Sequence, residues 1–220
     1  MQVLLFLHRL YFFVILNIRN KKTYKMKKII FLFIISSLIS IKGIGLTLSP
    51  ETEVSILTCA PGNELYSLFG HTAIRINDPR HQIDRVYNYG TFDFSTPHFY
   101  LKYARGLLPY QLTVQKFSHF IYNYQLEERT VYAQTIRLDS LEKQRIFDLL
   151  EENLLPQNRY YLYNFLFDNC TTRSRDILLK SLPDSVAWNM PDVNKNFWNL
   201  LDEYLQASPW VQWGIHTILG

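Results

Sequence analysis

A cysteine and a histidine are the two residues of this sequence best suited to covalent chemistry. Cys170 lies in the segment FDNCTTRSRD, at the predicted start of a helix. Unpaired N–H groups and the helix dipole at such a position favour the thiolate, which is the nucleophilic form of cysteine. The same N–H groups can stabilise an oxyanion. From this segment alone, a buried thiol, a disulfide with Cys59 and a nucleophile all remain open.

A cysteine nucleophile needs a base, and His71 is the histidine whose position best suits that role. It follows Gly70 at the start of the alternating run HTAIRIND, which predicts a strand with His71, Ala73 and Arg75 on one face. A rigid strand would aim the imidazole, although a histidine on a strand can equally be structural. The other histidines after residue 45 lie in turns, loops, aromatic segments or near the chain end: His81, His98, His119 and His216.

Two arginines follow the cysteine within the same segment, Arg173 and Arg175. Their guanidinium groups are suited to binding a phosphate head group or a carboxylate of a substrate. An ion pair with Asp176 or with another acid is the alternative explanation. The sequence therefore makes both arginines candidate substrate-binding residues.

Strands are predicted mainly in the first half of the sequence that follows residue 45, and helices mainly in the second half. The alternating or β-branched segments are 53–59, 71–78, 85–94, 111–115 and 130–138. Asp139 is predicted to cap a helix with Glu142 in a capping box, and Asn169 to cap another helix from about Thr171. A last helix is predicted at 196–205, and the segment YYLYNFLFD is ambiguous. This grouping indicates the α+β class.

The composition fits one globular domain with a substantial core, because 48% of the 220 residues are hydrophobic and 15% are aromatic. The formal charge of +4 originates in the N-terminal residues. Eight of the 23 Lys and Arg residues, and no acid, lie in residues 1–45, which leaves 15 basic and 19 acidic residues in the remainder. The charge therefore gives no support for nucleic-acid binding, and no nucleic-acid partner is expected.

The N-terminal residues are predicted to export the protein. Met26–Gly45 combines a charged start (MKK), a thirteen-residue apolar run (IIFLFIISSLISI) and small residues before a cleavage site at Leu46. The run is short for a membrane span, although an N-terminal anchor helix is the alternative. We therefore expect residues 1–45 to be an upstream extension plus a signal peptide, and residues 46–220 to be a periplasmic domain.

Three segments resemble the Lnb N-terminal periplasmic domain family of Bacteroidota-type bacteria: PGNELYSLFGHTAIRI, YNYGTFDF and YNFLFDNCTTRSRDIL. The FGH and DNCTTR blocks are specific when they occur together, and the resemblance covers roughly Glu51–Gly220. It implies a permuted NlpC-type, papain-like fold in which the histidine precedes the cysteine. Lecithin–retinol acyltransferase-like enzymes, which move acyl chains from phospholipids through a cysteine thioester, have a similar residue order and NC signature.

The resemblance implies that Cys170 is the nucleophile and His71 its base. Asn88, in YNYG, is the first choice for the group that orients the imidazole, with Asp93 and Asp84 as alternatives. The implied reaction is N-acylation of bacterial lipoproteins at the periplasmic side of the inner membrane. A phospholipid would donate the acyl chain, a lipoprotein would accept it and the protein would work at the membrane surface. No cofactor or metal is expected, because the cysteines lack zinc-type spacing.

Two other functions stay open. A hydrolase with the same dyad, cutting an amide such as a peptidoglycan cross-link, would need an open polar groove, whereas an acyltransferase needs an apolar channel beside Cys170. A binding or structural module stabilised by a Cys59–Cys170 disulfide would place the two sulfurs within bonding reach and His71 far from Cys170. Relatives generally continue into C-terminal membrane-spanning segments, which this sequence is expected to lack.

Overall fold

The computed structural model of the protein describes residues 45–99, 102, 106–182, 194–206 and 208–219. The chain divides into two units, Met1–Leu46 and Thr47–Gly220. Nearly all of the first unit lies outside the described residues, and so do the predicted signal peptide and upstream extension. Within the described ranges, no helix has both the length and the apolar character needed to cross a membrane.

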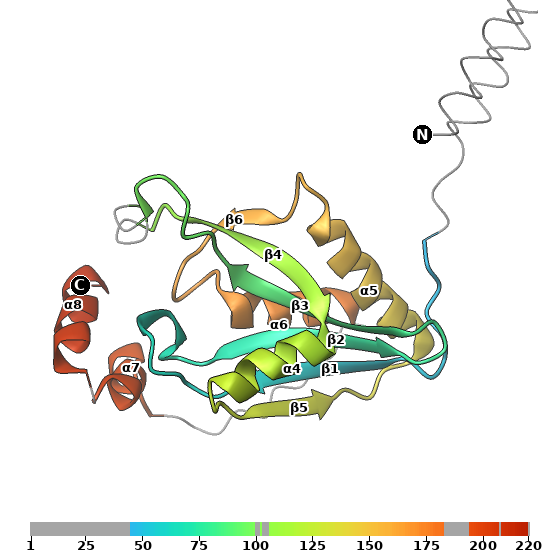
Figure 1. The fold of residues 1–220 in the computed structure, drawn as a ribbon, viewed down its shortest axis with the longest axis horizontal. Helices are drawn as coiled ribbons and strands as arrows, with labels where there is room; N and C mark the ends of the chain where they lie inside the picture. Colours follow the sequence, from blue (N-terminus) through green and yellow to red (C-terminus); the bar gives the residue numbers. More distant parts are fainter. Residues whose placement is uncertain (1–44, 100–101, 103–105, 183–193, 207, 220) are drawn as a thin grey trace, which may run out of the picture. The chain divides into compact units, whose positions relative to one another are not determined.

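A six-stranded antiparallel sheet forms the centre of the second unit (Figure 1), with strand order β5-β1-β2-β3-β4-β6. The predicted strands at 53–59 and 71–78 are confirmed with the same bounds, and β6 lies within the ambiguous aromatic segment. The strands are β1 (Glu53–Cys59), β2 (His71–Asp78), β3 (Ile83–Thr91), β4 (Pro109–Lys116), β5 (Val131–Thr135) and β6 (Tyr160–Leu162).

Five α-helices and one short 3-10 helix accompany the sheet in the described part of the chain. They are η1 (Leu65–Ser67), α4 (Phe117–Leu126), α5 (Ser140–Leu154), α6 (Cys170–Ser181), α7 (Phe197–Leu205) and α8 (Pro209–Leu219). The combination of an antiparallel sheet with separate helices confirms the α+β class. The permuted papain-like arrangement stays a prediction.

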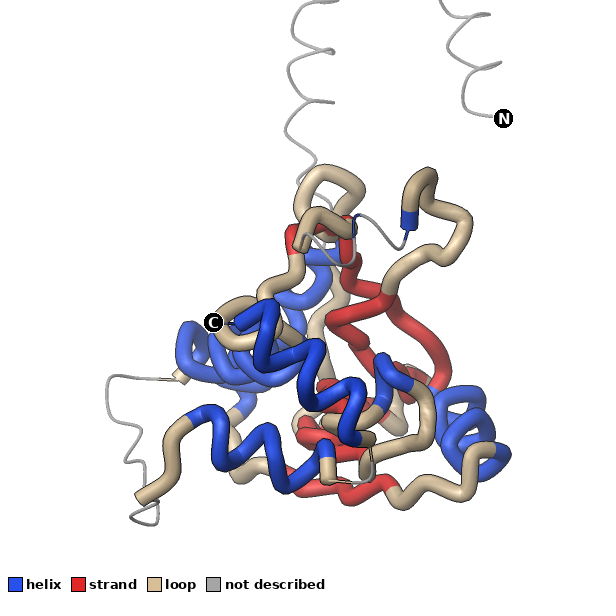
Figure 2. The backbone as a smooth tube through the Cα atoms, turned by 90° about the vertical axis from the view of Figure 1, so that its left-hand side faces the viewer, coloured by secondary structure: helices blue, strands red, loops and turns tan. Residues whose placement is uncertain are grey.

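Helix α4 covers one face of the sheet, and helices α5 and α6 cover the other (Figure 2). Successive side chains of β2 point to opposite faces of the sheet, so this strand contributes to the core on both sides. Ile74 and Ile76 are buried together with Ile146 of α5 and Ile177 of α6, whereas Ala73 is buried against Phe120 of α4. Removing these apolar side chains from water is the main term that holds the helices to the sheet.

Two of these helices are not predicted by the sequence pattern. Helix α4 has the sequence FSHFIYNYQL, whose aromatic and β-branched residues have no strong helix propensity. It forms because Phe120, which is 2% exposed, packs into the core beneath the sheet, so tertiary packing overrides local preference. The helix predicted at 196–205 is confirmed as α7, but it is not the last one, because α8 follows it.

A buried carboxylate ties the beginning of the second unit to the turn between β2 and β3. Asp78 is fully buried and accepts hydrogen bonds from the Ser49 N–H at 2.8 Å, the Ser49 hydroxyl at 2.7 Å and His81 Nδ1 at 2.8 Å. Burial alone would raise the pKa of Asp78. The hydrogen bonds from His81 and Ser49 outweigh burial and hold that pKa well below its usual range.

We expect Asp78→Asn to lower the free energy of unfolding by about 1–3 kcal/mol at pH 7, because the amide leaves buried donors unpaired. The folded-state pKa is depressed, so the ionised carboxylate stabilises the fold above the unfolded pKa of about 3.9. This stabilisation is lost as the pH falls through the lower folded pKa. Denaturant titrations should therefore show a smaller difference from wild type at pH 3 than at pH 7.

The control for this experiment is Asp84→Asn, which removes a half-exposed ion pair with Arg75 and should cost about 0–1 kcal/mol. An Asp78→Asn variant destabilised equally at both pH values would contradict the buried-carboxylate account.

Candidate active site

The candidate active site lies where strands β2 and β3 cease to pair. Their ladder ends at Ile74 opposite Tyr87, so His71 on β2 and Asn88 on β3 lie beyond the last pair. Helix α6 packs against both strands. His71 and Asn88 are thus outside the β2–β3 ladder, and Cys170, the first residue of α6, interacts with His71 and with the N–H of Thr72.

A bulge in β3 borders the same site. The register between β3 and β4 shifts between Asn88 and Thr91, and Gly90 within this bulge has φ of 88°. That conformation favours glycine. A Cβ at Gly90 would lie 3.7 Å from the Cβ of Cys170, so the bulge backbone lies directly beside the cysteine. Bulges next to functional sites commonly redirect side chains in this way.

Gly70 fixes the start of the strand that carries His71. It has φ of 73°, and a Cβ at this position would lie only 2.5 Å from the carbonyl oxygen of Cys59 on β1. Only glycine allows so close an approach, because real Cβ atoms do not come this near a backbone oxygen. His71 follows immediately and is paired with Cys59 in the β1–β2 register. The imidazole is therefore carried by a backbone held firmly against its neighbour.

The side chains of His71 and Asn88 contact each other. His71 Nε2 lies 3.2 Å from Asn88 Oδ1, and Asn88 is 6% exposed. An amide oxygen can only accept, so Nε2 carries the proton in this contact and Nδ1 is left to accept one. Asn88 thus selects the tautomer in which His71 can serve as a base.

The two alternatives for this orienting role are engaged elsewhere. Asp84 accepts from both Arg75 Nε and Arg75 Nη2, at 2.7 and 2.9 Å. Asp93 accepts from the N–H and hydroxyl of Ser95 at 2.8 and 2.7 Å, in the loop after β3. Among the three candidates, Asn88 is therefore the one that the structure brings to His71.

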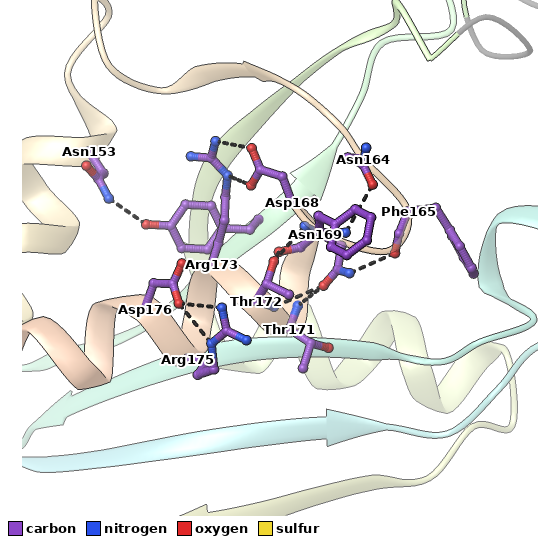
Figure 3. A network of polar contacts seen from close by, with 12 residues as sticks. Asn153, Asn164, Phe165, Asp168, Asn169, Thr171, Thr172, Arg173, Arg175 and Asp176 are labelled. Atoms are coloured by element: carbon purple, nitrogen blue, oxygen red, sulfur yellow. Dashed lines mark hydrogen bonds and ion pairs between the residues drawn. The ribbon is translucent and has the colours of Figure 1, made fainter. Parts of the chain in front are cut away.

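Helix α6 begins at Cys170, as the sequence predicts, and Asn169 is its N-cap (Figure 3). Asn169 Oδ1 accepts from the N–H groups of Thr171 and Thr172, each at 2.9 Å, and the Thr172 hydroxyl accepts from the Asn169 N–H at 2.8 Å. The N–H of Cys170 itself is not among the amides that this cap binds. The cap therefore fixes the helix start without occupying the first N–H beside the thiol.

The surroundings of Cys170 favour its thiolate. Burial by itself would raise the pKa of the thiol. The hydrogen bond and the charge of His71, the N–H of Thr72 and the hydroxyl of Thr171 outweigh burial, so the pKa of Cys170 lies below its ordinary value. The Thr72 and Thr171 hydroxyls also bond to each other at 2.9 Å, which ties β2 to α6 beside both residues.

The second cysteine has the properties of a structural thiol. Cys59 is 2% exposed and packs with Ala73, Val86 and Phe120. Burial raises the pKa of the Cys59 thiol to about 11. Both cysteines are free, so the described residues do not contain the disulfide that a structural module would require.

Both arginines after Cys170 are paired with carboxylates (Figure 3). Arg173 binds Asp168 through two contacts of 2.5 and 2.8 Å, and its guanidinium lies 3.6 Å from the ring centroid of Tyr161. Arg175 binds Asp176 at 2.7 Å. The ion pairs foreseen as the alternative for both arginines are therefore present. The predicted role of both arginines in substrate binding stays a prediction.

Three further residues next to the thiol are not singled out by the sequence reasoning: Thr72, Gly90 and Tyr161. An isolated glycine within a strand pattern is a recognised sign of a bulge, so Gly90 carried a usable signal. Nothing local marks Tyr161, because its position depends on the pairing of β4 with β6.

Comparison with known families identifies the domain. Residues 47–202 match the family model described as the Lnb N-terminal periplasmic domain, and the match includes Cys170, His71 and Asn88. The chain belongs to this family. The resemblance noted in the sequence is confirmed, and the family's description assigns such domains to the periplasm. No curated protein and no solved structure matches the chain.

We expect His71→Ala to raise the pKa of Cys170 and to slow its alkylation by iodoacetamide at pH 7 by about tenfold or more. The reason is that the thiolate fraction falls tenfold for each unit by which the pKa rises. The pH–rate profile of the Cys170-containing peptide, followed by mass spectrometry, measures this effect. His119→Ala, at an exposed position on α4, is the matched control and should leave the profile unchanged. Identical profiles for His71→Ala and wild type would contradict the thiolate–imidazole interaction.

Proposed function

We propose that this protein is an exported cysteine acyltransferase. It moves an acyl chain from a phospholipid, through a thioester on Cys170, to the N-terminal amine of bacterial lipoproteins. The observation that carries the proposal is the cluster formed by a Cys170 thiol of lowered pKa, the His71 imidazole and the Asn88 amide. A cysteine, a histidine and an asparagine in these roles are the constellation of papain-like enzymes, which supports the permuted papain-like arrangement and a covalent mechanism.

The first half-reaction transfers the acyl group to the enzyme. His71 Nδ1 accepts the thiol proton, and Cys170 Sγ attacks the ester carbonyl carbon of the phospholipid. A C–S bond forms and the carbonyl electrons move onto the oxygen, which becomes negatively charged. When this tetrahedral intermediate collapses, the ester C–O bond breaks, and His71 returns its proton to the departing lysophospholipid alkoxide.

The second half-reaction transfers the acyl group to the lipoprotein. The neutral α-amine of the acceptor attacks the thioester carbonyl and gives up a proton to His71. A C–N bond forms, the C–S bond breaks, and the Cys170 sulfur leaves as a thiolate, which regains a proton from His71. Asn88 keeps the proton of Nε2 in place, so that Nδ1 accepts and donates protons in both halves.

An aromatic series beside the thiol supports an acyl chain as the transferred group. The edge of Tyr163 lies 3.9 Å from the Cβ position of Gly90, and its ring stacks on Tyr110 at 4.3 Å. Tyr110 contacts Phe92 at 5.2 Å, and Phe92 contacts Phe94 at 5.0 Å. Phe94 is 62% exposed, so this series of contacting rings extends from the neighbourhood of Cys170 to the protein surface. Aromatic surroundings of this kind suit a hydrocarbon chain better than a polar cell-wall peptide.

The same reaction defines the location and partners in the proposal. A phospholipid donor and a lipid-anchored acceptor are both presented at a membrane surface, so the domain would act at the periplasmic side of the inner membrane. Arg173 and Arg175 follow the thiol by three and five residues along α6, where a phosphate could exchange with their carboxylate partners.

Complementation tests the proposed function. In a bacterium lacking lipoprotein N-acylation, the full chain should restore the N-acylated lipoprotein, as measured by the mass of its modified N-terminus. Cys170→Ala and His71→Ala should each reduce the product by about a hundredfold or more, because covalent and acid–base steps both fail. His119→Ala should retain activity. Wild-type levels of N-acylation in the Cys170→Ala strain would contradict the mechanism, and phospholipid cleavage without acceptor acylation would indicate a hydrolase.

A further inference from the structure

The hydroxyl of Tyr161, on strand β6, is buried, and its O–H donates to no acceptor in the described part of the structure. Buried hydroxyls are normally paired, because an unpaired one loses its bonds to water and gains nothing in return. Tyr161 makes no contribution to the mechanism given above. An unpaired donor of this kind marks a position where an acceptor atom from a ligand can complete the bond.

The Tyr161 hydroxyl lies beside the nucleophile. A Cβ at Gly90 would lie 4.0 Å from this hydroxyl and 3.7 Å from the Cβ of Cys170. The ring of Tyr163 also borders this position, at 3.9 Å from the point where a Gly90 Cβ would lie. Since Gly90 has no side chain, the space above its Cα is bordered by the nucleophile and by an unpaired donor.

The ring of Tyr161 is held in a fixed orientation. The Arg173 guanidinium stacks on it at 3.6 Å from the ring centroid, and Asp168 binds that guanidinium through two oxygens. Tyr89 and Tyr110 approach the ring with centroid distances of 6.4 and 6.3 Å. A donor that is positioned before the reaction requires no reorganisation when charge develops.

The hydroxyl keeps its proton at neutral pH. Burial raises the pKa of Tyr161, and the negative charge of Cys170 adds to the rise, whereas Arg173 and the N–H of Gly90 oppose it only in part. A neutral phenol can donate a hydrogen bond to an anion, which a phenolate cannot do.

We propose that the Tyr161 hydroxyl, together with the Cys170 N–H, forms the oxyanion hole of this site. The inference deepens the proposed function and rests on it. As Cys170 Sγ bonds to the carbonyl carbon, the carbonyl electron pair moves onto the oxygen, which accepts hydrogen bonds from both donors. Tyr161 retains its proton throughout, and the negative charge returns from the oxygen when the leaving group departs. Arg173 and Asp168 act as positioning residues for the Tyr161 ring.

Tyr161→Phe in the full chain tests this inference, because it removes one oxygen and retains the ring. The probe is p-nitrophenyl butyrate, whose reaction with Cys170 releases p-nitrophenolate and needs neither a phospholipid nor a lipoprotein. We expect the acylation rate constant to fall about 10²–10³-fold, the range found when a single oxyanion donor is removed. Alkylation of Cys170 by iodoacetamide should stay within twofold of wild type, since that displacement forms no oxyanion.

Tyr89→Phe is the matched control. Tyr89 is a buried tyrosine against which Tyr161 packs, but its hydroxyl accepts from Asn153 at 2.8 Å and is therefore already paired. Its removal should lower thermal stability and leave the acylation rate unchanged, whereas Tyr161→Phe should be as stable as wild type.

The outcomes separate the two proposals. Equal acylation rates for wild type and Cys170→Ala would overturn the proposed function, and the oxyanion assignment with it. A wild type that reacts much faster than Cys170→Ala, together with a Tyr161→Phe variant that matches wild type, would overturn the Tyr161 assignment alone. If Tyr161→Phe lowered the rates of acylation and of iodoacetamide alkylation to the same extent, the role of Tyr161 would be structural. That result would also overturn the assignment.

Discussion

The interaction of the Cys170 thiol with the His71 imidazole requires a helix start and a strand end to meet, and the surrounding structure is arranged around that requirement. The ladder between β2 and β3 ends before His71, so His71 and Asn88 lie outside it. Gly70 and Gly90 permit backbone approaches that a side chain would prevent. The hydrogen bond between the hydroxyls of Thr72 and Thr171 joins the two elements beside His71 and Cys170.

The pKa of each cysteine thiol depends on the balance between burial, which raises it, and hydrogen bonds from specific partners, which lower it. Burial disfavours a thiolate, and His71 with the N–H of Thr72 more than compensates, so the pKa of Cys170 is lowered. Cys59 lies across from His71 in the β1–β2 register, yet burial dominates there and its pKa is raised. The two cysteines thus differ in pKa because only Cys170 is hydrogen-bonded by His71 and by the N–H of Thr72.

Features encoded by neighbouring residues could be predicted from the sequence, and features created by packing could not. The caps at Asp139 and Asn169 and the strand of His71 follow from local patterns, and the structure confirms them. Helix α4 depends on Phe120 reaching the core, which no local pattern encodes. The proximity of Tyr161 to Gly90 depends on strand order. For the two arginines the sequence allowed both explanations and named Asp176 as a possible partner. The structure shows Asp176 paired with Arg175, and Asp168 paired with Arg173.

The most direct test of the account is a search for the acyl-enzyme on the full chain. After incubation with phospholipid vesicles and no acceptor, intact-mass measurement should show a gain of one acyl chain, located at Cys170 by peptide mapping and removed by hydroxylamine. The Cys170→Ala variant should show no gain. Absence of the adduct in the wild type under conditions where phospholipid is cleaved, or its location on another residue, would contradict covalent catalysis by Cys170.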